Sequence, residues 1–304
     1  MHKAIAVLQY KEEGQIIKRH PEYGMEERIL LSAIRYDRGT VTIDGKEYPM
    51  RDMNFPTVDP ADPLRLTDEE EELLHTLELS FRHNTRLHEH VRFLYSNGSM
   101  YKCCNSNLLY HGCIPMTENR EFDGLMVGGK MYRGKELMDF IDTQVKNAYF
   151  LPEDAPEKEA CRDFMWYLWN GAKSPVFGKD KNRSFEHYFI EDPEVMRETM
   201  NPYYQLSEEE ETCDMILKEF GLPTKGSHII NGHMPVKIKS GETPIRAGGK
   251  LFIIDGGLSK AYQERTGIAG YTLIFNSHHL ALAEHKPFDP ERERTPKVYI
   301  VEKM

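Results

Sequence analysis

The chain has 304 residues, with a hydrophobic fraction of 39% and an aromatic fraction of 11%. These values indicate a globular protein with a sizeable core rather than a disordered one. The formal net charge of −10, without a clustered basic face, argues against binding to a nucleic-acid backbone. No signal peptide and no apolar run of membrane-spanning length are present, so we expect a soluble cytoplasmic protein.

The first stretch, residues 1–97, predicts a helical insertion or cap with a small hairpin and no obvious chemistry. Apolar side chains recur at helical spacing over residues 3–38. Residues 40–49 then predict a β-hairpin that turns at Asp44-Gly45, a dipeptide typical of tight hairpin turns.

Two acidic runs follow a hydroxyl side chain, and both predict the start of a helix. Thr67 precedes the run at 68–72, and Ser207 precedes the run at 208–211. The hydroxyl can accept from backbone N–H groups of the first turn, and the carboxylates lie at the positive end of the helix dipole. We expect the first of these helices to extend to about residue 96.

The second stretch, residues 98–304, contains the segments that carry chemistry. Helices are expected near 134–149 and 157–170. Short apolar runs separated by turn residues leave little room for crossover helices, so they predict an antiparallel or mixed sheet. These runs are residues 227–231, 236–238, 250–255, 271–276, 279–284 and 297–301.

Two histidines stand beside glycine at the points where apolar runs end. They are His111, followed by Gly112, and His233, preceded by Gly232. A strand that stops at a glycine-bearing turn projects a side chain from the end of its sheet. Neutral imidazole is the commonest metal ligand in proteins, so the pair suggests a divalent-metal site.

Five cysteines without CxxC spacing predict reduced thiols rather than a disulfide frame or a zinc finger. Cys113 follows His111 by two residues and could be considered a nucleophile. No matching base stands at useful spacing, which favours a small buried thiol.

Basic side chains suggest anion binding in two places. The loop at 177–183 is basic and contains glycine, and it is either a phosphate-binding loop or a solvated turn. Lys237 and Lys239 alternate with apolar residues, so they mark either a solvent-facing edge strand or a pocket for an anionic substrate. The basic residues after His233, with a tyrosine among them, include Lys237, Arg246, Lys250, Lys260 and Tyr262.

Several of these segments closely resemble class III fructose-1,6-bisphosphatase. The long matching segments are 231–237, 240–250 and 253–263, and shorter ones are 98–102, 111–115 and 177–181. The resemblance covers essentially the whole chain. It implies an α/β (α+β) fold related to the calcineurin-like metallophosphoesterases, in which two sheets form a sandwich flanked by helices. Residues 98–304 would then be the C-terminal half of that catalytic domain, with residues 1–97 as a helical insertion.

The resemblance also implies an activity. Such enzymes hydrolyse fructose 1,6-bisphosphate to fructose 6-phosphate and phosphate, a step of gluconeogenesis, with water activated by two metal ions, usually Mn²⁺. The family's HG and GH motifs place metal ligands at His111 and His233. Asp255 either orients a ligand or caps its own turn. The candidate substrate-binding residues are Lys237, Arg246, Lys250, Lys260 and Tyr262.

The chain departs from the family pattern in the motifs that supply the other metal ligands. DxH, GDxxDRG and GNHD or GNHE do not occur, and Asp37-Arg38-Gly39 lacks the preceding Gly-Asp. Neutral imidazoles cannot offset the charge of two divalent cations, which need bridging carboxylates. We therefore expect a C-terminal half with an incomplete metal site, nearly inactive alone, whose partner is a missing N-terminal half or a second copy.

Two other classes of function remain open. The chain could be a non-catalytic binding or oligomerisation module that keeps a vestigial pocket. It could also be a metallophosphatase that acts on phosphoproteins. In each case we expect no nucleic-acid and no membrane partner.

Overall fold

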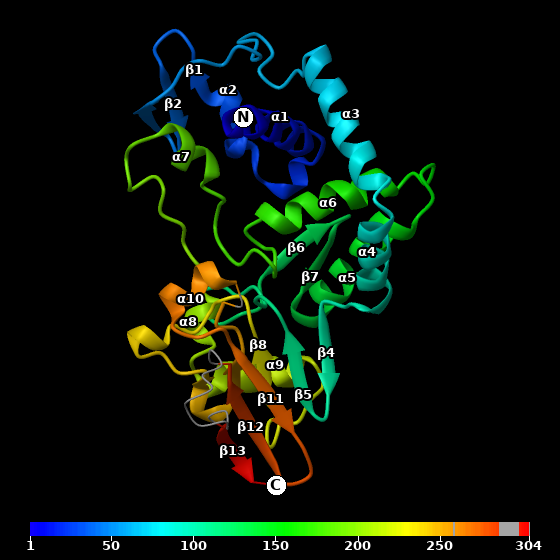
Figure 1. The fold of residues 1–304 in the computed structure, drawn as a ribbon, viewed down its shortest axis with the longest axis vertical. Helices are drawn as coiled ribbons and strands as arrows, with labels where there is room; N and C mark the ends of the chain where they lie inside the picture. The colour runs from blue at the N-terminus through cyan, green and yellow to red at the C-terminus, as the bar shows by residue number, and fades with distance from the viewer. Residues whose placement is uncertain (258, 286–297, 304) are drawn as a thin grey trace, which may run out of the picture. The chain divides into compact units, whose positions relative to one another are not determined.

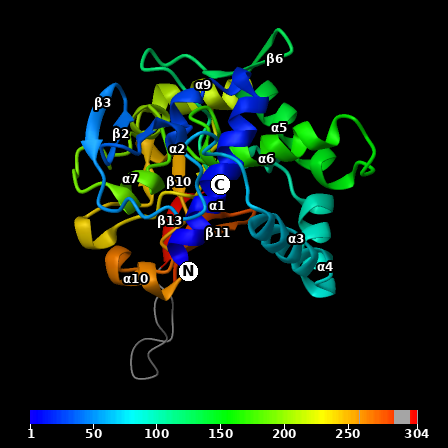
Figure 2. The ribbon, with the colours of Figure 1, turned by 90° about the horizontal axis from the view of Figure 1, so that it is seen from above.

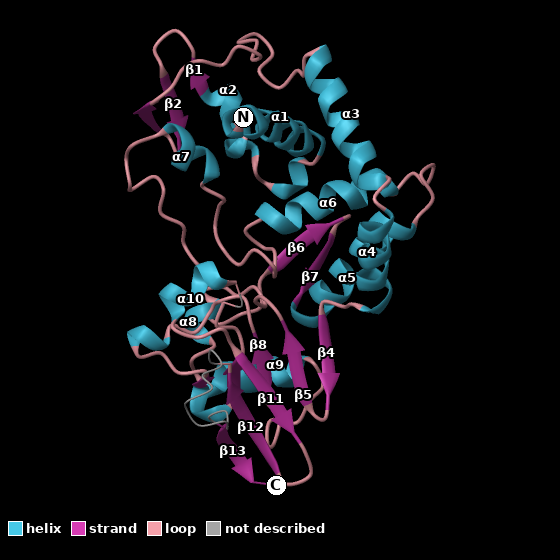
Figure 3. Ribbon diagram, viewed as in Figure 1, coloured by secondary structure: helices cyan, strands magenta, loops and turns pink. Residues whose placement is uncertain are grey.

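The computed structural model describes residues 1–257, 259–285 and 298–303 (Figure 1). It contains helices and several separate sheets, as the predicted α+β class requires (Figure 3). The chain divides into two compact units. Unit 1 comprises Met1–Ser99, Met126–Met131 and Ile141–Met200, and unit 2 comprises Met100–Leu125, Tyr132–Phe140 and Asn201–Met304. Among the described residues, no helix combines the length and apolarity that a membrane crossing requires.

Unit 1 is mainly helical and includes one antiparallel three-stranded sheet, in the order β1-β2-β3. Its strands are β1 Ile34–Arg35, β2 Thr40–Ile43 and β3 Lys46–Pro49. Its helices are α1 His2–Arg19, η1 Pro21–Tyr23, η2 Glu26–Arg28, α2 Leu30–Ala33, α3 Asp68–Arg82, α4 Thr85–Asn97, α6 Lys158–Asn170 and α7 Ser184–Phe189.

The predicted hairpin is confirmed, and it is visible as β2 and β3 in Figure 2. Its turn residues Asp44 and Gly45 have φ angles of 49° and 77°, the left-handed backbone that a tight hairpin turn requires. The helix predicted to reach residue 96 is instead two helices, α3 and α4. The chain breaks at His83, and the side chain of Asn84 caps α4 by accepting from the N–H of Leu87 at 3.0 Å.

The division into units differs from the predicted boundary at residues 97 and 98, because residues 141–200 pack with the N-terminal segment. Tyr10 of α1 lies 5.3 Å from Phe185 of α7 between ring centroids. Arg19 pairs with Asp163 of α6 at 2.9 Å. These contacts join residues more than 140 positions apart, so no local pattern in the sequence reveals them.

Unit 2 contains a mixed five-stranded sheet in the order β4-β5-β8-β10-β9. β5, β8 and β10 run parallel, and β4 and β9 are antiparallel to their neighbours. A second sheet is an antiparallel meander of β11, β12 and β13. The strands of both sheets are β4 Tyr101–Cys104, β5 Asn107–Tyr110, β8 Ile229–Asn231, β9 Ile245–Arg246, β10 Leu251–Ile253, β11 Tyr271–Phe275, β12 His279–Glu284 and β13 Val298–Lys303.

The helices of unit 2 are short. They are α8 Tyr203–Leu206, α9 Glu210–Glu219, η3 Ile238–Ser240, η4 Ala247–Gly249 and α10 Lys260–Thr266. The hairpin strands β6 Gly124–Val127 and β7 Lys130–Arg133 and the helix α5 Gly134–Phe150 each include residues of both units.

Both sheets of unit 2 and helix α9 contribute to one core. Ile229 and Phe252 of the five-stranded sheet, Leu280 and Leu282 of β12, and Ile216 of α9 are all fully buried in it. A core shared by two sheets agrees with the predicted pair of packed sheets. The mixed and antiparallel strand directions also confirm the sheet prediction.

Two local predictions in unit 2 are wrong. Residues 236–238 do not form a strand, because the chain turns into η3 and leaves it through Gly241 at a φ of 82°. Lys237 and Lys239 therefore share no strand face. Ser207 does not cap the following helix: it is buried at the end of α8, and α9 begins after Glu209 without a side-chain cap.

Thr67 caps α3 as predicted, and the cap is connected to a buried ion pair. The Thr67 side chain accepts from the N–H of Glu70, and the Glu70 carboxylate accepts from the N–H of Thr67 at 2.9 Å. The same carboxylate pairs at 2.6 Å with the ammonium of Lys11, whose side chain is fully buried. Burial raises the pKa of the Glu70 carboxyl, but Lys11 and the other donors outweigh it, and the pKa lies below its usual value.

We expect Glu70→Gln to lower the free energy of unfolding by about 3–5 kcal/mol, because Lys11 would be left buried without a counter-charge. Because the pKa of the Glu70 carboxyl is lower in the folded state, the ionised carboxylate stabilises the fold at pH values above the pKa of the unfolded state. This contribution disappears as the pH falls through the pKa of the folded state. The variant should therefore lose less stability on acidification than the parent. Urea denaturation at neutral and acidic pH measures both effects, with the exposed neighbour Glu71→Gln as control. Equal stability of the two variants would contradict the role of the pair.

Candidate functional site

The two predicted histidines lie together at the carboxyl ends of adjacent parallel strands. β5 and β8 pair with Leu108 opposite Ile229. His111 directly follows β5, and His233 is the second residue after β8. Their ring centroids are 5.4 Å apart, and their planes are nearly perpendicular at 84°. The structure thus brings together two side chains that are separated by more than 120 positions in the sequence.

The buried amide of Asn231 holds the two loops against each other. Its Nδ2 group donates to the carbonyl of Gly112 at 2.7 Å and to the carbonyls of Tyr110 and His111, both at 3.2 Å. The N–H of Gly232 adds a hydrogen bond to the carbonyl of His111 at 3.1 Å. Asn231 was not among the residues predicted to belong to the site, although an Asn-Gly pair is a signal of a tight turn.

Position 232 leaves little room for a side chain because the His111 ring approaches it closely. A Cβ atom at this position would lie 3.0 Å from Nδ1 of His111. His111 is exposed and His233 is half-buried, so the imidazole pair faces an accessible edge of the sheet. The backbone of His233 is left-handed, with a φ of 63°.

The side chains at this edge do not complete a two-metal centre. Across the described ranges, no three His, Cys, Asp or Glu side chains converge as ligands for one ion. Asp255, the nearby carboxylate considered as a ligand-orienting group, accepts from the N–H of Gly257 at 2.8 Å and so caps its own turn. Two imidazoles can supply part of the coordination of a divalent ion, but two such ions also need carboxylates.

Lys237 and Tyr262 lie on segments that leave the same edge of the sheet. The N–H of Val236 donates to the carbonyl of Asp255 at 2.9 Å, which ties the segment after His233 to the end of β10. Lys237, the next residue, has an exposed side chain. Tyr262 on α10 is 54% exposed. The side chain of Lys260 lies outside the described residues.

Arg246 and Lys250 lie at the opposite edge of the sheet. Lys250 precedes the first residue of β10, and its carbonyl accepts from the N–H of Ile229 at the start of β8. Arg246 is paired with Leu251, the first residue of β10. The length of the parallel strands therefore separates both side chains from the histidines, and the structure does not bring them into one site.

Both of these cations are already paired with carboxylates. Lys250 contacts Asp214 at 2.9 Å and donates to the carbonyl of Thr224. Arg246 pairs with Glu208 and, at 3.3 Å, with Glu242. These contacts give the two side chains a structural role that explains their presence without a substrate.

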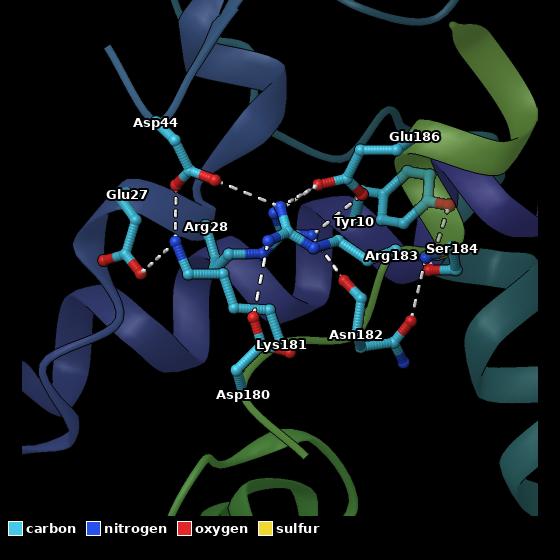
Figure 4. Close-up of polar contacts among 10 residues, drawn as sticks. All are labelled: Tyr10, Glu27, Arg28, Asp44, Asp180, Lys181, Asn182, Arg183, Ser184 and Glu186. Atoms are coloured by element: carbon cyan, nitrogen blue, oxygen red, sulfur yellow. Dashed lines mark hydrogen bonds and ion pairs between the residues drawn. The ribbon is translucent and has the colours of Figure 1, made fainter. Parts of the chain in front are cut away.

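The basic loop at 177–183 is likewise neutralised within unit 1 (Figure 4). Lys181 pairs with Asp44 and, at 3.6 Å, with Glu27. Arg183 pairs with Asp44 at 3.2 Å and with the buried Glu186 at 3.3 Å. The sequence offered a phosphate-binding loop or a solvated turn, and the structure instead engages Lys181 and Arg183 in ion pairs with carboxylates.

Cys113 is a buried thiol rather than a nucleophile. Its side chain is fully buried, and burial raises the pKa of the thiol to about 12. All five cysteines are free, as the sequence predicted.

Comparisons with known proteins identify the family. The family described as Firmicute fructose-1,6-bisphosphatase matches residues 1–301. The chain belongs to this family. The class 3 fructose-1,6-bisphosphatase of Bacteroides fragilis is 53% identical over 95% of this chain and 43% of its own length. The proteins of the same name from Clostridium beijerinckii and Alkaliphilus metalliredigens are each 52% identical over 95% of the chain, and cover 43% and 44% of their own lengths. No solved structure matches the chain.

The chain thus spans less than half the length of these relatives. The matches nevertheless run over 95% of this chain. The prediction that a missing N-terminal half is the partner of this chain is therefore wrong.

We expect Asn231→Leu to lower the free energy of unfolding by about 1–3 kcal/mol, because buried carbonyl groups would lose their donor. Urea denaturation measures this loss, and the exposed Asn54→Leu serves as the control. If both variants were as stable as the parent, the Asn231 amide would not be the group that holds the two loops together.

Proposed function

We propose that this chain functions in the hydrolysis of fructose 1,6-bisphosphate to fructose 6-phosphate and phosphate. The observation that carries the proposal is the identity of 50% or more to relatives named class 3 fructose-1,6-bisphosphatase, along 95% of the chain. The accessible imidazole pair at the carboxyl ends of β5 and β8 supplies a site at which such chemistry can take place.

The reaction sets demanding requirements. Water attacks phosphorus, the ester P–O bond breaks, and the leaving oxygen takes a proton. Enzymes accelerate hydrolysis of phosphate monoesters by up to ~10²¹-fold, which requires groups that stabilise negative charge on the phosphoryl oxygens. An imidazole can move a proton or ligate a divalent cation, and two imidazoles in contact can divide these roles.

We assign His111 and His233 as the ligands that this chain contributes to a divalent cation, with Mn²⁺ as the preferred ion. The two adjacent nitrogen donors support a divalent cation. The choice of Mn²⁺ rests on the resemblance to class III fructose-1,6-bisphosphatase and not on the donor set. Because the described side chains do not complete a two-metal centre, we derive no catalytic step from the metal. Lys237 and Tyr262 remain the candidate substrate contacts, since both follow the same edge of the sheet.

We expect the purified protein to release phosphate from fructose 1,6-bisphosphate in the presence of Mn²⁺. His111→Ala should lower kcat/KM by at least the ~10–100-fold that is typical even of residues that only orient metal ligands. Mn²⁺ affinity, measured by titration calorimetry, should fall in the same variant. His278→Ala is the matched control, because this histidine is exposed in unit 2 and lies on the β11–β12 turn.

Two outcomes would contradict the proposal. Faster turnover of a phosphopeptide than of the sugar bisphosphate would identify a protein phosphatase. Binding of the sugar bisphosphate without phosphate release, unchanged in His111→Ala, would identify a binding module.

A further inference from the structure

A groove in unit 1 has a charge opposite to that of the whole chain. It has a volume of about 580 Å³ and lies between the end of α3, helix α4, the end of α5 and the start of α6. Its walls carry Arg82, Arg92, Lys158 and Arg162, and Glu153 is the carboxylate among its lining side chains. In a chain of net charge −10, this concentration of cations requires an explanation.

Three of the cations are arranged around the carboxylate of Glu153. Arg162 donates to both of its oxygens, at 2.8 and 2.7 Å. Lys158 lies 3.1 Å away and Arg82 3.9 Å away. The hydrogen bonds from Arg162 lower the pKa of the Glu153 carboxyl to about 2. The groove therefore already holds one anionic group between converging donors.

Lys158 is held in position before any ligand arrives. The side chain of Lys158 is only 6% exposed, and its ammonium also donates to the carbonyl of Leu151. Arg92 of α4 is exposed, and within the described part of the chain it has no ion-pair partner. Arg82 also pairs with Glu78 at 2.7 Å, but Arg92, Lys158 and Arg162 still outnumber the carboxylate of Glu153 in the groove lining.

An aromatic cluster adjoins these cations. Tyr149 stacks on Tyr95 of α4 at 4.8 Å between ring centroids, and its hydroxyl is 3.3 Å from Nε2 of His88. Phe150 packs edge-on against Tyr149 at 4.9 Å, yet its side chain is 48% exposed. An apolar ring thus stands open to solvent beside the basic wall.

We propose that this groove binds a small organic phosphate, with the phosphate between Arg92, Arg162 and Lys158 and the apolar part of the ligand on Phe150. Charge-assisted bonds from arginine and lysine suit phosphate oxygens. The volume is in the range of small-molecule sites, ~300–1,000 Å³. All of its lining residues belong to unit 1, whereas the histidine pair belongs to unit 2. The groove is therefore a second site, and the proposal does not depend on the catalytic one.

Calorimetric titration of the protein with inorganic phosphate and with phenyl phosphate at low salt tests this proposal. Phenyl phosphate should bind more tightly than inorganic phosphate, and Phe150→Ala should remove the difference. Arg162→Gln and Arg92→Gln should each weaken both probes by about tenfold, the equivalent of ~1.4 kcal/mol per lost contact. Glu153→Gln should have the opposite effect and tighten both, because it removes the competing carboxylate.

Two controls separate this site from other causes. Arg197→Gln makes the same charge change at a 75% exposed side chain of unit 1 and should leave both affinities unchanged. The changes in affinity caused by Arg162→Gln and Glu153→Gln should be the same in a His111→Ala background, because the histidine pair is a separate site. Equal binding in the parent, Arg162→Gln and Glu153→Gln would overturn the proposal, as would an equal loss in Arg197→Gln. Because Glu153→Gln and Arg162→Gln should act in opposite directions, partial unfolding cannot reproduce the pattern.

Discussion

The parallel pairing of β5 with β8 is the constraint on which the candidate site depends. Strands that run in the same direction end at the same edge, so the residues that follow them meet. The register pairs Leu108 with Ile229, and both side chains are fully buried. This register places His111 beside His233. It also places the Asn231 amide within hydrogen-bond distance of the carbonyl of Gly112.

The distribution of carboxylates decides which cations are available to a ligand. Lys250 and Arg246 look like phosphate-binding residues in the sequence, yet Asp214, Glu208 and Glu242 neutralise them. In the groove beside α4 and α6, by contrast, Arg92 has no ion-pair partner in the described part of the chain. A basic residue in an acidic protein is more often half of an ion pair than part of a binding site, and only spatial neighbours distinguish the two cases.

The sequence predicted those features that a few adjacent residues determine. The Asp44-Gly45 turn and the Thr67 cap were confirmed, because each depends on local backbone geometry. The expectation that His111 and His233 belong to strand ends that a fold brings together is confirmed, whereas their role as metal ligands stays a prediction. The split of the helix at Asn84 and the packing of residues 141–200 with the first 99 were missed. In the latter case the decisive contacts are between residues far apart in the chain, such as Arg19 and Asp163.

The left-handed backbone at His233 limits which amino acids can occupy that position. A φ of 63° costs energy for most side chains, whereas glycine adopts it freely and Asn, Asp and His are enriched there. Alanine at this position would add backbone strain to the loss of the imidazole, and asparagine would remove the imidazole with less strain. Chain geometry therefore restricts the side chains that position 233 accepts, and histidine is among the few that fit. The metal-binding role proposed for His233 restricts this position a second time.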